Sequence, residues 1–192
     1  MRIFCVVLIG CLSFNASAKS SKDCLELKAE QIRLALTGSN LANINSTRTA
    51  EGGPYRPFII KACSNGQCDV SRDKRAPLMK YLPGHPDADK NGYVAYPNID
   101  EKSEYATFNM IASKLKLFAS VKACGSKILI DNGNSSFAIR YDDKKKSNVK
   151  EDIFNLTNSQ QVVSWMRQDS QGRATTINFA PKGQIVSPSQ AE

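Results

Sequence analysis

The sequence contains a single histidine, His85, among 192 residues. A Ser-His or Cys-His pair needs an imidazole as its base, so this residue is the one that such a catalytic site would require. His85 lies within Pro-Gly-His-Pro (residues 83–86), a turn-forming stretch, and no nucleophile stands out elsewhere. We therefore expect no catalytic residues, no enzyme activity and no cofactor.

Clusters of metal ligands are also scarce. Asp87, Asp89 and Asp100 are the acidic residues nearest to forming a cation site. The stretch Asp-Lys-Asn-Gly at residues 89–92 is, however, more typical of a turn, because Asn, Asp and Gly favour turn conformations. We expect no metal site.

Long apolar runs are missing after residue 18, so nothing there is suited to cross a membrane. The chain begins with Met1-Arg2, an apolar run over residues 3–12 and an Ala-x-Ala site, which together predict a secretory signal peptide over residues 1–18. The apolar run is too short to remain as a membrane-spanning helix. A rival interpretation takes Leu-Ile-Gly-Cys at residues 8–11 as a lipoprotein cleavage box, with a lipid anchor on Cys11. Both interpretations predict export.

Acidic residues are fewer than basic ones, 18 against 26, which gives a net charge of +8. Such a charge raises the question of nucleic acid. The basic residues are dispersed, however, and the dense run Lys144–Lys146 directly follows Asp142-Asp143, as in a solvated loop. An exported chain has little access to nucleic acid. We therefore expect no nucleic-acid partner and instead a basic surface that faces an anionic cell envelope.

Removal of residues 1–18 would leave four of the six cysteines, Cys24, Cys63, Cys68 and Cys124. An even number of cysteines in an oxidising compartment predicts two disulfides. Asn-Gly between the middle two is the preferred centre of a type I′ hairpin turn, which places Cys63 opposite Cys68 at disulfide distance. Cys24 and Cys124 then pair with each other. Zinc is the competing use of four cysteines, but one C-x₄-C pair and two distant single cysteines lack its usual ligand spacing.

Two helices are expected. The first covers residues 23–42 and has a narrow, mostly apolar face whose members recur every three or four residues, as on a coiled-coil helix: Cys24, Leu27, Gln31, Leu34, Gly38 and Leu41. The second follows the capping residue Asp100 and covers residues 102–123, which contain no Gly or Pro. A bond between Cys24 and Cys124 would join the start of one helix to the end of the other. The two helices are therefore expected to form an antiparallel pair.

Short strands are expected between the helices. The disulfide-clipped hairpin pairs residues 58–62 with 68–70, and residues 93–96 form a further strand. This part, residues 19–124, is expected to be one unit made of the helical pair and its β insertion.

Residues 125–192 are expected to form a small β-rich module. Strands are predicted at 127–130, 137–141, 152–156 and 175–180. Thr157 or Ser159 is expected to cap a short helix over 160–167, in which Trp165 anchors the core of the module. The fold class is thus α+β.

Several motifs resemble one family. Residues 38–43, Gly-Ser-Asn-Leu-Ala-Asn, resemble the A-S-N-L-A-N signature near the N-terminus of flagellar rod and hook proteins. Three later stretches resemble the FlgC family of flagellar basal-body rod proteins in their order and spacing: Gly52-Gly-Pro-Tyr-Arg56, Tyr81-x-Pro-Gly-His-Pro-x-Ala-Asp89 and Gly92-Tyr-Val-x-x-Pro-Asn-Ile-Asp100. The likeness covers roughly residues 29–123.

The resemblance implies N- and C-terminal helices in a coiled coil, a small β insertion and no catalytic residues. Family members polymerise as part of the rod that links the flagellar motor to the hook. This chain departs from the family in its export signal, in the sequence of residues 113–120 at the end of the second helix and in about seventy further residues after that helix. These departures favour a periplasmic relative with a changed role.

We expect a non-enzymatic structural or assembly protein of the bacterial cell envelope, in the periplasm or the flagellar basal body. It would self-associate or bind other flagellar rod and envelope proteins by packing its paired helices against neighbouring subunits. The residues expected at these contacts are Leu34, Ser39, Asn40, Leu41, Ala42 and Asn43 on the first helix and Phe108, Ile111, Leu115 and Phe118 on the second. One alternative is a soluble periplasmic binding module whose C-terminal extension recognises a ligand or a protein. Another is an envelope lipoprotein anchored at Cys11.

Overall fold

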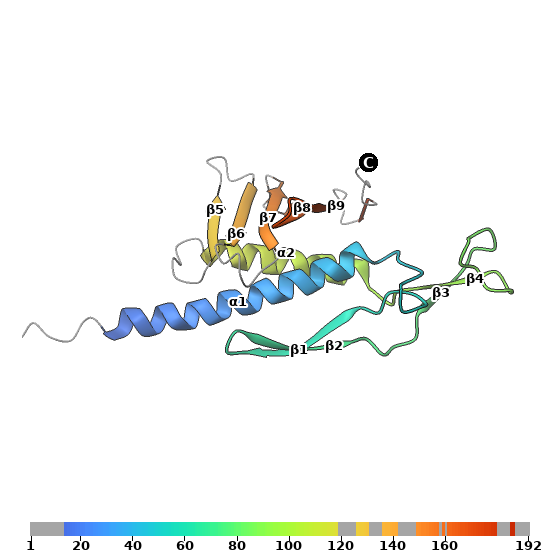
Figure 1. Cartoon of the computed structure of the whole chain (residues 1–192), viewed down its shortest axis with the longest axis horizontal. Coiled ribbons are helices and arrows are strands. Elements are labelled where there is room, and N and C mark those ends of the chain that lie inside the picture. The colour runs from blue at the N-terminus through green and yellow to red at the C-terminus, as the bar shows by residue number, and fades with distance from the viewer. Residues whose placement is uncertain are drawn as a thin grey trace, which may run out of the picture.

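The computed structural model describes residues 14–118, 126–130, 136–141, 149–157, 159, 161–179 and 185–186, with side chains from residue 21 onward except in 126–130 and 185–186. Its helices and antiparallel strands confirm the α+β class (Figure 1). The elements in chain order are α1 (Phe14–Ala42), β1 (Phe58–Ser64), β2 (Gln67–Arg72), β3 (Leu78–Tyr81), β4 (Tyr93–Tyr96), α2 (Glu101–Leu117), β5 (Ser126–Ile130), β6 (Ser136–Tyr141), β7 (Val149–Leu156), β8 (Val162–Asp169), β9 (Ala174–Phe179) and β10 (Ile185–Val186).

The two helices lie side by side and run in opposite directions (Figure 1). Glu30 of α1 binds Lys114 near the end of α2, whereas Asn40 near the end of α1 binds Glu104 near the start of α2. Asp100 caps α2, because its side chain accepts a hydrogen bond from the backbone N–H of the second helical residue at 3.2 Å. The helix pair is the frame on which the strands are placed.

Both helices differ from expectation at one end. α1 begins at Phe14 rather than near residue 23, so the cleavage site predicted after Ala18 lies within the helix. The added residues contain neither Gly nor Pro, and they include good helix formers. α2 ends at Leu117, whereas the absence of Gly and Pro predicted a helix as far as residue 123.

β1 and β2 form a hairpin that lies along α1. Asn65 (φ 50°) and Gly66 (φ 72°) have the left-handed backbone conformation that a type I′ turn requires. Cys63 lies opposite Cys68, and the two residues form a disulfide with their α-carbons 4.0 Å apart. The Asn-Gly turn thus sets the register that brings these two sulfur atoms together.

β3 and β4 form a separate two-stranded ribbon that projects beyond the ends of the helices (Figure 1). A glycine is required where the ribbon closes: Gly92 has φ +83°, and a Cβ at this position would lie 2.8 Å from a ring carbon of Tyr81. All residues of β3 are exposed. The ribbon therefore presents side chains to the surroundings instead of enclosing a core.

The remaining strands form one antiparallel sheet in the order β10-β9-β8-β7-β6-β5. The sheet covers the helix pair on the side away from the β1–β2 hairpin (Figure 1). One cluster of buried side chains joins the two layers: Leu27, Leu34, Leu41, Phe108, Ile111, Ala112 and Leu115 from the helices, and Phe137, Ile139, Phe154, Val162, Trp165, Ile177 and Phe179 from the sheet. Strands β6, β7, β8 and β9 of the predicted C-terminal module thus share a core with the helices.

The short helix predicted over residues 160–167 is wrong, because strand β8 covers most of this range. Val162 and Trp165 are both buried and lie three residues apart, a spacing that imitates a helical face. Backbone pairing with β7 on one side and β9 on the other fixes the extended conformation, with Phe154 directly opposite Trp165. Strand β7 begins at Val149, three residues before the start of the strand predicted over residues 152–156.

Candidate assembly surface

Asn40, in the polar exit of α1, connects three elements of the fold. Its side-chain nitrogen donates hydrogen bonds to the backbone oxygen of Phe58 at 3.0 Å and to Glu104 Oε1 at 2.8 Å. Its side-chain oxygen accepts from the backbone N–H of Phe58 at 2.8 Å and from the Tyr55 hydroxyl at 3.1 Å. Both donors and both lone pairs of the amide are used, and the residue is only 4% exposed. Asn40 therefore holds α1, β1 and α2 together within the chain.

The other polar residues of the predicted contact set also bind within the chain. The hydroxyls of Ser39 and Tyr55 lie 3.1 Å apart. The side chain of Asn43 donates to the backbone oxygen of Ser39 at 2.9 Å and accepts from the hydroxyl of Ser46 at 3.1 Å. Ala42 packs at the edge of the core. This motif stabilises the end of α1 and the start of the following loop.

The apolar residues of the predicted contact set are buried inside the chain: Leu34, Leu41, Phe108, Ile111 and Leu115 are at most 2% exposed, and Phe118 packs at the edge of the core. The ring of Phe108 lies 5.4 Å from that of Trp165 and 5.6 Å from that of Phe179. The sequence correctly marks this helix face as buried. The neighbouring subunit expected there is replaced, in the structure, by the chain's own sheet.

At Gly38, α1 and the sheet lie close together. A Cβ at this position would lie 2.4 Å and 2.5 Å from two ring carbons of Trp165. The absence of a side chain at Gly38 makes room for the indole ring. Trp165 is therefore packed directly onto the helix that carries the flagellar-protein motif, and not within a separate module.

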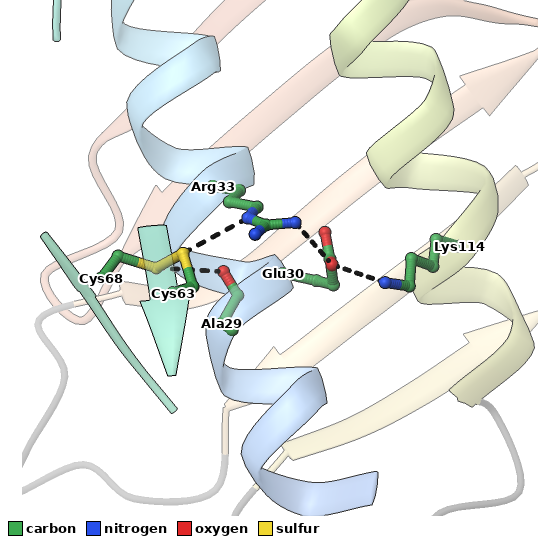
Figure 2. The surroundings of a disulfide bond; sticks show 6 residues. All are labelled: Ala29, Glu30, Arg33, Cys63, Cys68 and Lys114. Atoms are coloured by element: carbon green, nitrogen blue, oxygen red, sulfur yellow. Dashed lines mark hydrogen bonds and ion pairs between the residues drawn. A yellow bond between two sulfur atoms is a disulfide. The ribbon is translucent and has the colours of Figure 1, made fainter. Parts of the chain in front are cut away.

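An ionic chain links the disulfide hairpin to both helices (Figure 2). Arg33 Nε donates to Cys63 Sγ at 3.3 Å, and Arg33 Nη1 donates to Glu30 Oε1 at 3.2 Å. From α2, Lys114 Nζ binds the same glutamate oxygen at 2.7 Å and also binds Glu26 at 2.8 Å. These hydrogen bonds raise the pKa of Lys114 and lower that of Glu26. The side chain of Glu30 is 3% exposed, and its buried charge is paired with both cations, Arg33 and Lys114.

A second polar network is buried under the sheet around Asp152, which is fully buried. Its carboxylate accepts hydrogen bonds from the Tyr141 hydroxyl at 2.7 Å, from Trp165 Nε1 at 3.1 Å and from Arg167 Nε and Nη2 at 2.8 and 2.9 Å. Burial and the adjacent carboxylate raise the pKa of Tyr141. All four acceptor positions of Asp152 are occupied, so this network positions the sheet and leaves no site for a ligand.

This network was not predicted, although the sequence contains a signal for it. Asp152 and Phe154 are two residues apart in a predicted strand and so lie on the same face. A carboxylate on an inward face needs a buried partner. Arg167 lies opposite Asp152 on β8 and supplies that partner. This arginine had been predicted to lie on a helix.

In the described part of the chain, large apolar side chains are exposed in three places, the first of which is the β1–β2 hairpin with Ile59 (39%) and Val70 (36%). The ribbon exposes Leu78, Met79, Tyr81, Leu82 and Tyr93, each between 40 and 64%. The outer side of α2 exposes Met110 (64%) and Leu117 (80%). These surfaces, rather than the buried helix face, are available to a partner.

Neither a metal site nor a membrane span is found in the described part of the chain. No group of His, Cys, Asp and Glu residues there is placed to hold a metal ion. No described helix combines the length and the hydropathy needed to cross a bilayer. Cys124, the predicted partner of Cys24, lies outside the described residues, so that disulfide stays a prediction.

Known proteins similar to this chain belong to the family that the motifs resemble. No family model matches the chain. Flagellar basal-body rod protein FlgC of Yersinia enterocolitica is 31% identical over 106 residues, which are 50% of this chain and 78% of that protein. The FlgC of Borreliella burgdorferi is 27% identical over 137 residues (57% of this chain, 84% of that protein), and that of Salmonella typhimurium is 39% identical over 88 residues (41% and 66%). The chain belongs to the FlgC family.

The FlgC motifs gather at one end of the molecule. Residues 38–43 close α1, residues 81–89 and 92–100 build the ribbon and lead into α2, and Asp100 caps that helix. The matches to FlgC proteins extend over 41 to 58% of the chain. In this FlgC family member, the motifs lie where the helices meet the ribbon. The sheet is formed by residues that follow the motifs in the sequence.

Proposed function

We propose that this protein is a non-enzymatic structural component of the bacterial cell envelope that assembles with flagellar rod proteins. The observation that carries the proposal is its membership of a family whose named members are basal-body rod proteins. The exposed apolar side chains of the ribbon and of α2 support it, because a protein that works alone seldom keeps such surfaces uncovered.

In this proposal the ten residues first expected at subunit contacts have an internal task. Asn40 and its neighbours hold the helix junction, and the apolar residues hold the sheet against the helices. Contacts with neighbouring subunits are made by the outer side of α2 and by the ribbon. Helix packing remains the mode of assembly, but on the opposite face of the second helix.

We further propose that residues 1–18 direct the chain to the periplasm. The basic start, the short apolar run and the small residues before Lys19 support this step. N-terminal sequencing of the protein from a periplasmic fraction should begin at Lys19. Mass spectrometry that instead finds a lipid on Cys11 would establish lipoprotein processing, and a full-length cytoplasmic chain would refute export.

A second function, that of a periplasmic binding module, is favoured by one observation. The sheet already covers the inner face of the helix pair, so the chain needs no neighbouring subunit to bury it. Size-exclusion chromatography and affinity purification from the native cell separate the two functions. Co-purification with rod proteins, or ordered self-association, supports assembly. A monomer that binds neither itself nor any rod component supports the binding module.

A further inference from the structure

A cavity of about 420 Å³ lies where the β1–β2 hairpin meets the two helices. Its walls come from α1, β1, the start of α2 and the segments that lead into and out of the ribbon. The lining residues are of two kinds. Some are apolar, such as Leu36 and Ile60, and three are acidic, namely Asp73, Asp100 and Glu104. We call this space the junction cavity.

Glu104 is the carboxylate that the chain itself does not neutralise. Asp73 binds the guanidinium of Arg75 at 2.6 and 2.7 Å, and Asp100 caps α2. The amide of Asn40, which donates to Glu104 Oε1 at 2.8 Å, is the one partner of the Glu104 carboxylate in the described part of the chain. Oε2 has no partner there. Since every sealed polar atom of the described side chains does have one, Oε2 is accessible from the cavity that Glu104 lines.

Thr37 places a second unused oxygen in the same cavity. This residue lies on α1, one turn before Asn40, and is only 4% exposed. Its hydroxyl makes no hydrogen bond within the described part of the chain and, like Glu104 Oε2, it is not sealed. A hydroxyl that is so deeply buried normally finds a partner, because burial without one is costly. The cavity therefore contains two unused acceptors, one from each helix.

The fold does not need the negative charge of Glu104. Asn40 requires an acceptor at this position, and a neutral amide oxygen would serve as well. Burial raises the pKa of Glu104, so the folded chain disfavours the charged form of this side chain. A carboxylate that is unfavourable for the fold and has an unused oxygen in a cavity is typical of a binding site.

The two acceptors define the ligand as an organic cation. No group of His, Cys, Asp and Glu side chains in the described residues is placed to hold a metal ion. Thr37 and Glu104 approach the cavity from different helices, which suits the several N–H donors of a planar guanidinium better than the compact charge of an ammonium group. The apolar residues Leu36 and Ile60 would contact the alkyl chain that carries the cation.

We propose that the junction cavity binds an alkylguanidinium group, such as an arginine side chain, whose N–H groups donate to Glu104 Oε2 and to the hydroxyl oxygen of Thr37. The inference goes beyond the proposed assembly function and does not depend on it. Two sources can present this chemistry: a free small molecule, or an arginine in a segment of another protein.

The test uses an alanine pentapeptide with arginine at its centre and blocked ends, and isothermal titration calorimetry measures its Kd for the purified protein. A peptide with citrulline in place of arginine is the matched control, because citrulline has nearly the same shape and no charge. We expect the arginine peptide to bind at least about tenfold more tightly than the citrulline peptide. A lysine peptide should bind at least about threefold more weakly than the arginine peptide.

Three variants assign the binding to the cavity. Glu104→Gln should abolish the preference for arginine over citrulline, and Thr37→Val should raise the Kd of the arginine peptide about threefold or more. Glu51→Gln removes one charge from an exposed loop residue outside the junction cavity and should leave every Kd unchanged. Circular dichroism should show the parent fold in all three, because glutamine can still accept from Asn40 and the Thr37 hydroxyl has no partner to lose.

A one-residue probe, N-acetylarginine amide, separates the two sources. A Kd equal to that of the arginine peptide supports a free small molecule as the ligand. A peptide that binds at least about tenfold more tightly than this probe supports an arginine in a protein segment.

Equal Kd values for the arginine and citrulline peptides, or an arginine peptide that binds Glu104→Gln as tightly as the parent, would overturn the proposal. A lysine peptide that binds as tightly as the arginine peptide would overturn the assignment to a guanidinium. Co-purification with rod proteins tests the assembly function by itself, so either proposal can fail while the other stands.

Discussion

At Gly38, a single missing methyl group decides how closely the sheet approaches the helix. A Cβ there would lie 2.4 Å from a ring carbon of Trp165, well inside normal contact distance. The indole cannot easily move away, because its Nε1 donates to the buried Asp152 at 3.1 Å. Glycine costs an isolated helix about 1 kcal/mol relative to alanine, so its presence at this position has a packing reason.

Gly38→Ala should therefore destabilise the protein even though alanine favours a helix. Overpacking costs about 1–3 kcal/mol, which exceeds the gain of about 1 kcal/mol in helix propensity, and the free energy of unfolding should fall. Urea denaturation measures the change. Gly84→Ala is the control, because no atom lies within 4 Å of a Cβ at that position. A Gly38→Ala variant as stable as the parent would show that the ring does not rest on the helix.

Asp152→Asn should be among the more damaging single substitutions in the sheet. It keeps the shape of the side chain but leaves the partly buried Arg167 guanidinium without its counter-ion, at a cost of about 3 kcal/mol. Glu151→Gln on the same strand is the matched control: it removes the partner of Arg140, which is 53% exposed, and should cost at most about 1 kcal/mol. Comparable losses for the two variants would mean that the network around Asp152 is not buried.

Glu104 gives the stability a pH dependence of known sign. Burial raises its pKa above the ordinary 4.5, although the hydrogen bond from Asn40 opposes the shift. The folded state thus keeps this proton over a pH range in which the unfolded chain has lost it, so stability falls as the pH rises through the folded-state pKa. Glu104→Gln keeps an acceptor for Asn40 and removes the charge.

We expect Glu104→Gln to be at least as stable as the parent near neutral pH and to lose this part of the pH dependence. Urea midpoints of parent and variant, measured from pH 4.5 upward, provide the comparison. A variant that is less stable at neutral pH, with the same dependence on pH as the parent, would contradict the assignment.

At the scale of elements, the disulfide hairpin is where local sequence was most informative. The Asn-Gly turn fixes the register over two residues, and the register alone brings Cys63 and Cys68 together. Cys63→Ala/Cys68→Ala removes a short cross-link, and the chain-entropy description gives a loss of about 2 kcal/mol. The parent should accordingly unfold at a higher urea concentration than the variant under oxidising conditions. The two should converge when a reductant is added, and a persistent difference would assign the effect to packing.

The element that local sequence predicted wrongly is β8. The spacing of Val162 and Trp165 is compatible with one face of a helix, and only pairing with β7, which is a long-range contact, decides for a strand. The strands β5, β6 and β9 were predictable because their apolar residues alternate or follow one another between clear turn signals. Local sequence patterns thus predict the strands whose conformation is set by their own residues. They fail for β8, whose conformation is set by pairing with a neighbouring strand.

At the scale of the whole molecule, the difference between local and long-range information also explains why a subunit contact was predicted on the helix face that the sheet covers. The periodicity shows that the helix faces carrying Leu34 and Phe108 are buried. It does not show which element covers them. The family resemblance suggested a neighbouring subunit, because it covers the helices and the ribbon and not the sheet. The charge on Asp152 was the one local indication that the C-terminal strands have an ionic partner inside the fold.

The central claim is that the helices and the C-terminal sheet form one cooperative core. Trp165, the only tryptophan, lies in the sheet and contacts α1, so its fluorescence reports the sheet–helix contact while far-UV circular dichroism reports the helices. We predict that the two signals change together in a single urea transition with the same midpoint. A loss of the fluorescence signal at a clearly lower urea concentration, with the helical signal intact, would contradict the claim and restore two independent parts.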